Sequence, residues 1–370
     1  MFIKLGALSL VVGACPAFCM ASLLMSDEEV QNESVQESAT QEIEGPCCVK
    51  PVQECMVIIP DCCRVKIFDP QGLECDKHFW LEGDLLYWQA NEDGLSFAME
   101  SDSTTSIKNG QIIHPDFDWD WGFRLGLGYK IPHDKWDLFF NYTYIQSKAD
   151  GSADATAVFP TMESSFGLPS GYYATKANFN WKSTVNVADL ELGRNCFVSR
   201  WLSIRPFMGV RGALIDQTTT VWYQGGTAVP LGDTDKCHLT NDFWGVGLRM
   251  GFDSLWGLGA GWGIYGNGAA SVLSGKFSVK QMEKWVNADE KRVSLTADKD
   301  SIVVAAEMAL GVQWDYMFSR DRYHFGMKFG WEFNVFFDQN QMVRVTNSSF
   351  NPNDGDLAFQ GVTLGFRFDF

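Results

Sequence analysis

The sequence predicts an all-β protein, a transmembrane antiparallel up-and-down β-barrel of about ten strands. Three observations predict it. Segments of ten or more residues alternate between apolar and polar or small side chains, whereas strands of soluble sandwiches run about 5–6 residues. The breaks between these segments alternate between short and long. Outside the first two dozen positions, no run of about 18 apolar residues is present to form a membrane-spanning helix.

Residues 1–21 have the pattern of a secretory signal peptide. Lys4 supplies a positive charge, an apolar stretch follows, and Ala21 offers a small residue at the cleavage point. We expect cleavage after Ala21. A second interpretation is a bacterial lipoprotein signal, in which Cys15 would become the lipidated first residue. Both interpretations predict export from the cytoplasm.

Residues 22–77 are expected to form an acidic, cysteine-rich periplasmic spacer. Residues 22–44 contain no aromatic side chain and are rich in Glu, Ser and Gln, a composition typical of disorder. In an exported protein, closely spaced cysteines favour disulfides. The candidates are Cys47, Cys48, Cys55, Cys62, Cys63 and Cys75, together with Cys196 and Cys237. The last two either pair with each other or stay unbonded, and bonds between chains would link the protein to other envelope proteins.

Residues 78–370 are expected to form the barrel. In residues 121–131, every second side chain is apolar: Trp121, Phe123, Leu125, Leu127, Tyr129 and Ile131. Glycines and charges occupy the positions between them, and residues 136–146, 302–316 and 323–334 repeat the pattern. Because side chains alternate across a strand, the apolar face would meet lipid and the other face would line the lumen.

The breaks between strands give a second indication of a barrel. With residues 79–90 as the first strand, the expected short periplasmic turns are 132–135, 199–200, 254–259 and 319–322. The expected long external loops are 91–118, 147–175, 216–241, 275–299 and 339–356. This order gives about ten strands. Strand-like pieces inside the long loops make twelve the alternative count.

Residues 79–95, Phe-Trp-Leu-Glu-Gly-Asp-Leu-Leu-Tyr-Trp-Gln-Ala-Asn-Glu-Asp-Gly-Leu, resemble the first strand and loop of the pore-forming outer-membrane proteins of Legionella and Chlamydia-like bacteria, the MOMP-like family. Residues 122–129 and 136–144 resemble the next hairpin of that family, and the likeness continues to Phe370. The resemblance implies a porin-type barrel in the bacterial outer membrane. In chlamydial relatives it also implies a disulfide-linked envelope, which the double cysteines of the spacer would suit.

The chain ends in an alternating apolar strand formed by Val362, Leu364, Phe366, Phe368 and Phe370. This pattern resembles the signal that the barrel-assembly machinery reads. The alternative is an ordinary last strand that happens to end in Phe. Together with the export signal, the pattern favours the assembly role.

The polar faces of the predicted strands place charged side chains in the lumen. Seven basic and seven acidic candidates follow from parity: Glu82, Asp84, Arg124, Lys130, Asp137, Arg205, Arg211, Arg249, Glu307, Asp315, Lys328, Glu332, Arg367 and Asp369. Charges of both signs would wet a pore and set its selectivity. The sequence therefore predicts a porin-like protein for passive diffusion of small hydrophilic solutes or ions. The alternative is that the charges pair and close the interior, which leaves a structural or adhesive barrel crosslinked by disulfides.

Composition and motifs exclude other classes of function. The chain carries 46 Asp and Glu against 29 Lys and Arg, a net charge of -17, which argues against a nucleic-acid partner. The sequence contains no nucleophile motif that would predict an enzyme, and no cofactor is expected. A metal site is not expected either, because the cysteines lack zinc-type spacing and the loop from Asp116 lacks the Gly and Glu of a calcium loop. The expected partners are outer-membrane lipid, the barrel-assembly machinery, disulfide-linked envelope proteins and a second copy of the chain.

Overall fold

The computed structural model describes residues 78–104, 110–131, 136–163, 171–230, 232–318, 323–346, 349–352 and 355–370. The expected signal peptide and the cysteine-rich spacer lie outside the described residues. The same is true of the predicted turns 132–135 and 319–322. Among the described residues, no helix is long and apolar enough to cross a membrane.

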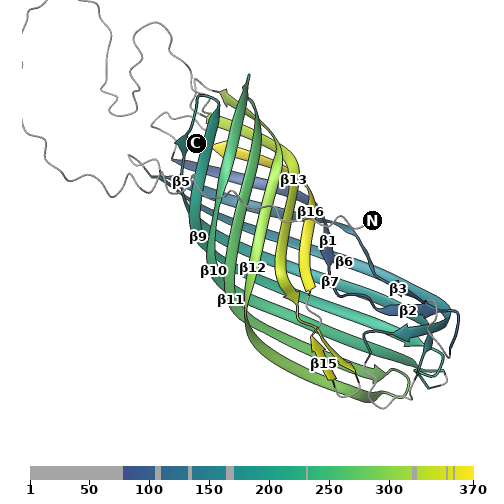
Figure 1. Cartoon of the computed structure of the whole chain (residues 1–370). Helices are drawn as coiled ribbons and strands as arrows, with labels where there is room; N and C mark the ends of the chain where they lie inside the picture. Colours follow the sequence, from purple (N-terminus) through teal and green to yellow (C-terminus); the bar gives the residue numbers. More distant parts are fainter. Residues whose placement is uncertain are drawn as a thin grey trace, which may run out of the picture. The chain divides into compact units, whose positions relative to one another are not determined.

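The described residues form a closed antiparallel barrel of ten strands (Figure 1). In ring order the strands are β1 (Phe79–Glu92), β5 (Trp119–Lys130), β6 (Trp136–Pro160), β7 (Ala174–Arg194), β9 (Leu202–Gln224), β10 (Thr234–Gly259), β11 (Trp262–Trp285), β12 (Glu290–Phe318), β13 (Tyr323–Asn340) and β16 (Gly355–Asp369). The first and last strands, β1 and β16, pair with each other and close the ring. The predicted fold and the count of ten strands are confirmed.

Short strands attach to the ends of the ring. Between β1 and β5 lie β2 (Ala98–Ser101), β3 (Gly110–Ile113) and β4 (Asp116–Phe117), and both β2 and β4 pair with β6 beyond the end of β5. Between β7 and β9, β8 (Cys196–Phe197) pairs with the start of β9. A separate hairpin joins β14 (Val343–Thr346) to β15 (Ser349–Pro352).

The strands extend further than the sequence predicts at the end of the barrel opposite Phe79 and Phe370. The expected loop 275–299 is instead a hairpin in which β11 and β12 pair as far as Trp285 and Glu290. The expected loop 216–241 is shortened in the same way, because β9 and β10 pair as far as Gln224 and Thr234. These loop bounds were wrong because backbone pairing continues after the lipid-facing pattern has stopped.

One predicted turn also moves. Residues 254–259 belong to β10, and the turn to β11 is the pair Ala260 and Gly261. Ala260 has φ 52° and Gly261 has φ 84°, the left-handed conformations that a two-residue hairpin requires. Gly261 meets this requirement without strain, since it has no Cβ.

Inward and outward side chains alternate along the long strands, with a bulge in β12, but the polarity of the two faces inverts partway along, as β10 shows. In β10, the outward side chains from Trp244 to Leu258 are apolar except Ser254, and those from Thr234 to Asp242 are polar. The inward side chains change in the opposite direction. They are glycines and Arg249 where the outer wall is apolar, and apolar residues such as Phe243 where the outer wall is polar. We call the part with the apolar outer wall the membrane-spanning half and the remainder the distal half.

The interior of the distal half is a packed apolar core. Its largest members are almost fully buried: Phe97, Trp181, Tyr223, Phe243, Phe277 and Phe359. Three segments outside the ring strands add Phe97, Met162 and Met342 to this core. The segments therefore fold into the mouth of the barrel and fill it.

Because the polarity of the outer wall inverts, the loss of unfolding free energy caused by a charged substitution on this wall should depend strongly on its position. Leu310 lies on the lipid-facing part of β12 with 65% of its surface exposed. Leu310→Arg should lower the free energy of unfolding by about 2–4 kcal/mol, the cost of Arg near the bilayer midplane. Thr296→Arg, on the exposed distal part of the same strand, should cost less than about 0.5 kcal/mol. Urea unfolding in lipid vesicles measures both, and equal losses would contradict the assignment of the two halves.

Candidate functional site

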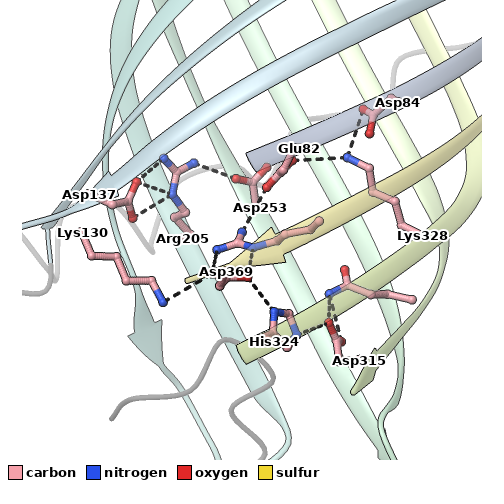
Figure 2. A network of polar contacts seen from close by, with 12 residues as sticks. Glu82, Asp84, Lys130, Asp137, Arg205, Asp253, Asp315, His324, Lys328 and Asp369 are labelled. Atoms are coloured by element: carbon pink, nitrogen blue, oxygen red, sulfur yellow. Dashed lines mark hydrogen bonds and ion pairs between the residues drawn. The ribbon is translucent and has the colours of Figure 1, made fainter. Parts of the chain in front are cut away.

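The charged residues predicted from parity all lie inside the membrane-spanning half of the barrel. Each of them makes at least one ion pair there. The ion pairs form two clusters, parts of which are drawn in Figure 2. The pore-lining role of these residues remains a prediction, because the geometry gives their positions and partners only.

The first cluster centres on Arg205 of β9. Its Nε donates to both carboxylate oxygens of Asp137 at 3.0 and 3.1 Å. Its Nη1 donates to Asp253 at 2.9 Å and to Glu191 at 3.2 Å. One guanidinium thus joins side chains of β6, β7 and β10, which is the fork-like geometry that Arg forms with carboxylates.

Two further arginines extend this cluster. Arg211 donates from Nε and Nη2 to the two oxygens of Asp189 at 2.6 and 2.7 Å. Arg249 donates to Glu307 at 2.6 Å and also pairs with Glu191. Because Glu307 pairs with Arg211 as well, the contacts cross the interior from β9 and β10 to β12.

The second cluster lies near the closure of the ring. Arg124 of β5 binds Glu332 of β13 through two hydrogen bonds of 3.2 and 2.9 Å, and binds Asp84 of β1 at 3.0 Å. Lys328 reaches Asp84 at 3.1 Å. Arg367 of β16 pairs with Glu82 at 3.1 Å. These contacts tie the first and last strands to their neighbours.

A buried histidine ends the second cluster at the short-turn side. His324 has no exposed surface, and its two ring nitrogens lie 2.6 Å from Asp369 and 2.9 Å from Asp315 (Figure 2). A histidine donates from both nitrogens only when both carry a proton. The geometry therefore suits an imidazolium held between two carboxylates. Lys130 lies 3.9 Å from Asp369 and completes this end.

Four members of the clusters were missed by the sequence prediction: Asp189, Glu191, Asp253 and His324. Asp189 and Glu191 alternate with Leu190 and Leu192, so the same parity rule would have found them. With the seven predicted acids, the three extra carboxylates make ten. They face the seven predicted Lys and Arg residues and His324, so the described clusters are richer in acids than in bases.

A cavity of about 210 Å³ lies among these side chains. Members of both clusters line it, together with Trp80, Phe139 and Tyr265. No lining residue belongs to the apolar core of the distal half, as far as the structure describes both. The interior is therefore polar and partly open across the membrane and packed beyond it.

A smaller ionic cluster is buried in the distal half. Arg292 pairs with Glu163, which follows β6, and with Asp235 of β10. A β-bulge opposite Glu283 and Lys284 shifts the register of β12 at this point, and bulges re-aim side chains. Burial and the neighbouring Asp235 raise the pKa of Glu163 well above its usual range, against the effect of Arg292.

Two disulfide candidates lie within the described residues, and neither forms a disulfide there. Cys196 faces Ile204 in the ladder of β9, whereas Cys237 faces Val221 near the other end of that strand. These partners are separated by about 56 Å at about 3.3 Å per residue, far beyond the reach of a disulfide. Pairing of Cys196 with Cys237 within one chain is excluded. The six spacer cysteines lie outside the described residues.

The C-terminal strand closes the ring as the sequence predicts. The apolar alternation from Val362 to Phe370 faces outward on β16. Phe368 stacks on Tyr323 with ring centroids 5.9 Å apart, and the backbone of Phe370 pairs with Phe79. Recognition of this strand by the assembly machinery stays a prediction.

The closed ring, the apolar outer wall and the polar interior define an outer-membrane β-barrel protein. The family model described as "Legionella pneumophila major outer membrane protein precursor" matches residues 74–370, and the chain belongs to this family. The predicted family and the outer-membrane location are confirmed. A search of curated proteins found no match.

Solved structures of outer membrane proteins are similar to the chain at low identity. The outer membrane protease OmpT of Escherichia coli is 9% identical, with a TM-score of 0.42 over 82% of this chain and 100% of its own. A major outer membrane protein of Thermus thermophilus is 9% identical, with a TM-score of 0.34 over 80% of this chain and 100% of its own. The P. putida toluene transporter TodX is 9% identical, with a TM-score of 0.32 over 81% of this chain and 91% of its own.

Removal of one buried partner should destabilise the membrane-spanning half. Arg205→Ala leaves Asp137 buried without its cation and removes one of the two cations that pair with Glu191. We expect the free energy of unfolding to fall by about 3–5 kcal/mol. Lys176→Ala breaks the exposed pair with Asp154 and should cost less than about 1 kcal/mol. Urea titrations of both variants in vesicles measure the difference. A loss for Arg205→Ala no larger than for Lys176→Ala would show that solvent already screens the cluster.

Because the pKa of the buried Glu163 is raised, we predict that the stability of the folded chain falls as pH rises. Its pKa is higher in the folded chain than in the unfolded chain, where it is about 4.3. Its contribution is therefore complete below that value and is lost as pH rises toward the folded-state pKa. Glu163→Gln keeps the neutral shape and should flatten the decline of unfolding midpoints between pH 5 and 9. Glu290→Gln, on an exposed position of β12, is the control. Equal slopes in wild type and Glu163→Gln would refute the prediction.

Proposed function

We propose that the protein is a porin-like channel for small hydrophilic solutes or ions, and that the described structure is its closed state. The observation that supports this most directly is the contrast between the two interiors. The distal half is filled with apolar side chains, while the membrane-spanning half holds charges around a cavity. Replacement of buried ion pairs by apolar side chains of similar volume is often neutral or stabilising. Stability alone therefore does not require the charged interior, whereas a route for hydrated solutes does.

We attribute the closure of the channel to the segments that fold into the distal half. The hydroxyl of Tyr223 donates to the carbonyl of Phe97 at 2.6 Å, and that of Thr161 donates to Ser96 at 2.7 Å. The side-chain amide of Asn340 donates to the carbonyl of Asp93 at 2.8 Å. A conducting state would require these segments to leave the interior, while the ten strands of the wall stay paired.

The excess of acids in the two clusters favours cations. Rings of Asp and Glu select cations because they stabilise positive charge in a narrow polar passage. Asp189, Glu191 and Asp253 supply this excess. We therefore propose weak cation preference and no catalytic role for the barrel.

A structural envelope barrel without an open pore is the second candidate. It is favoured by the tight apolar packing of the distal half, where Phe97, Trp181 and Tyr223 have no exposed surface. In this case the charged interior would serve insertion, since a strand with two apolar faces would be poorly soluble before assembly. A structural envelope barrel would also be linked to other envelope proteins by disulfides through the spacer cysteines.

Conductance recording separates the two candidates. Phe97→Ala removes a large side chain from the core of the closing segments, which costs about 3–5 kcal/mol in well-packed interiors. We expect discrete conductance steps in planar bilayers to become about tenfold more frequent than in wild type, with reversal potentials that favour cations. Ile112→Ala, at a site 55% exposed on β3, should leave the frequency unchanged. Electrical silence of wild type and Phe97→Ala alike would leave the structural barrel as the better description.

A further inference from the structure

A layer of buried polar side chains crosses the apolar core of the distal half. Ser147, Ser183, Gln217 and Asn241 are successive cross-strand partners on β6, β7, β9 and β10. The same layer receives Gln339 from β13, because the amide of Asn241 donates to its carbonyl at 2.8 Å. All of these side chains are 0–1% exposed.

Apolar side chains border this polar layer on both sides. One row nearer the membrane, the inward residues are Ile145, Val185, Ile215 and Phe243. One row further out they are Ala149, Trp181, Thr219 and Leu239. The polar layer is therefore separated from the charged cavity and from the distal surface by largely apolar rows.

Polar atoms of the layer lack partners among the described residues. The unpartnered atoms are both carboxylate oxygens of Glu92, the hydroxyls of Ser147 and Ser183, Nε2 of Gln217, Oδ1 of Asn241 and both amide atoms of Gln339. Nε1 of Trp181, in the bordering row further out, also lacks a partner. Buried polar groups in folded proteins are almost always hydrogen-bonded, to protein or to an internal molecule. So many such atoms in one layer point to a molecule that bonds them.

Glu92 shows how the two sides of the layer face each other. It lies on β1, and burial raises its pKa well above the usual range, while Gln217 of β9 and Trp181 of β7 oppose the shift. Both side chains are thus close enough to act on the carboxyl, yet neither makes a hydrogen bond of ordinary geometry with it. A small molecule beside the carboxyl would supply the well-formed hydrogen bonds that all three side chains lack.

The chemistry of the layer selects an uncharged occupant. Among the described residues, Glu92 is its only ionisable side chain, and the other members are amides and hydroxyls, with the indole of Trp181 in the row that borders them. An anion would meet no cation in this described layer. A cation would meet a single carboxyl, whose pKa burial raises.

We infer that this polar layer is a binding site for small uncharged molecules that both donate and accept hydrogen bonds through hydroxyl groups. Water and a small polyol share this chemistry. Gln217 Nε2 and Trp181 Nε1 donate to the occupant, and Asn241 Oδ1 accepts from it. Occupancy does not depend on conduction, although in an open channel the layer would lie across the route.

Nuclear magnetic resonance on the full chain refolded in lipid nanodiscs tests the site directly. We expect the indole N–H of Trp181 to show magnetisation transfer with water. Trp88 is the internal control, because it is equally buried and its Nε1 already donates to Thr363 at 3.2 Å. Glycerol is the second probe. A selective shift of the Trp181 signal on its addition identifies a polyol as an occupant, and transfer from water without that shift identifies water. If Trp181 shows neither transfer from water nor a shift with glycerol, the inference is overturned.

A substitution pair gives an independent readout. If an occupant bonds the two hydroxyls, Ser147→Ala combined with Ser183→Ala loses those bonds, and the urea midpoint should fall. If the layer is dry, the same change removes two unpaired hydroxyls from an apolar core, and the midpoint should stay or rise, which contradicts the site. Ser152→Ala, exposed on the same strand as Ser147, is the matched control. The resonance experiment uses the unmodified chain and stands even if the double variant fails to refold.

Discussion

The whole structure depends on one constraint: successive side chains of a β-strand point to opposite faces, and a closed ring turns those faces into an outside and an inside. Every residue of the ten strands is therefore assigned to one of two environments by its parity. Trp244 and Phe243 are neighbours in the chain, yet one is exposed on the outer wall and the other is buried in the interior. No side chain can change its environment unless the register of its strand changes.

The inversion of polarity lets one set of strands work in two solvents. Across the membrane the outer wall must be apolar, and the charges lie inside. Beyond the membrane the outer wall meets water, and the same strands bury an apolar core of the kind that soluble proteins use. This explains why β12 continues for 29 residues, about three times the length that a bilayer requires of a tilted strand.

The two interiors differ in what holds them. In the membrane-spanning half, arginines such as Arg205 join three strands through directional contacts, and each contact loses much of its value if one partner is removed. In the distal half, packing is non-directional and depends on filled volume. Movement of the inserted segments that carry Phe97 and Met162 would therefore open the distal interior while the ionic contacts keep the wall closed.

The sequence by itself determined the parity of the strands, the number of strands and the inward direction of charges such as Arg124, because period two is a local property of the extended backbone. It did not determine that Arg124 meets Glu332, 208 positions away, or that Cys196 and Cys237 lie at opposite ends of one strand ladder. Those outcomes follow from the closure and stagger of the ring, which bring distant strands together. The lengths of the strands beyond the membrane were likewise decided by the tertiary structure, since an apolar interior there forms only when the inserted segments fill it.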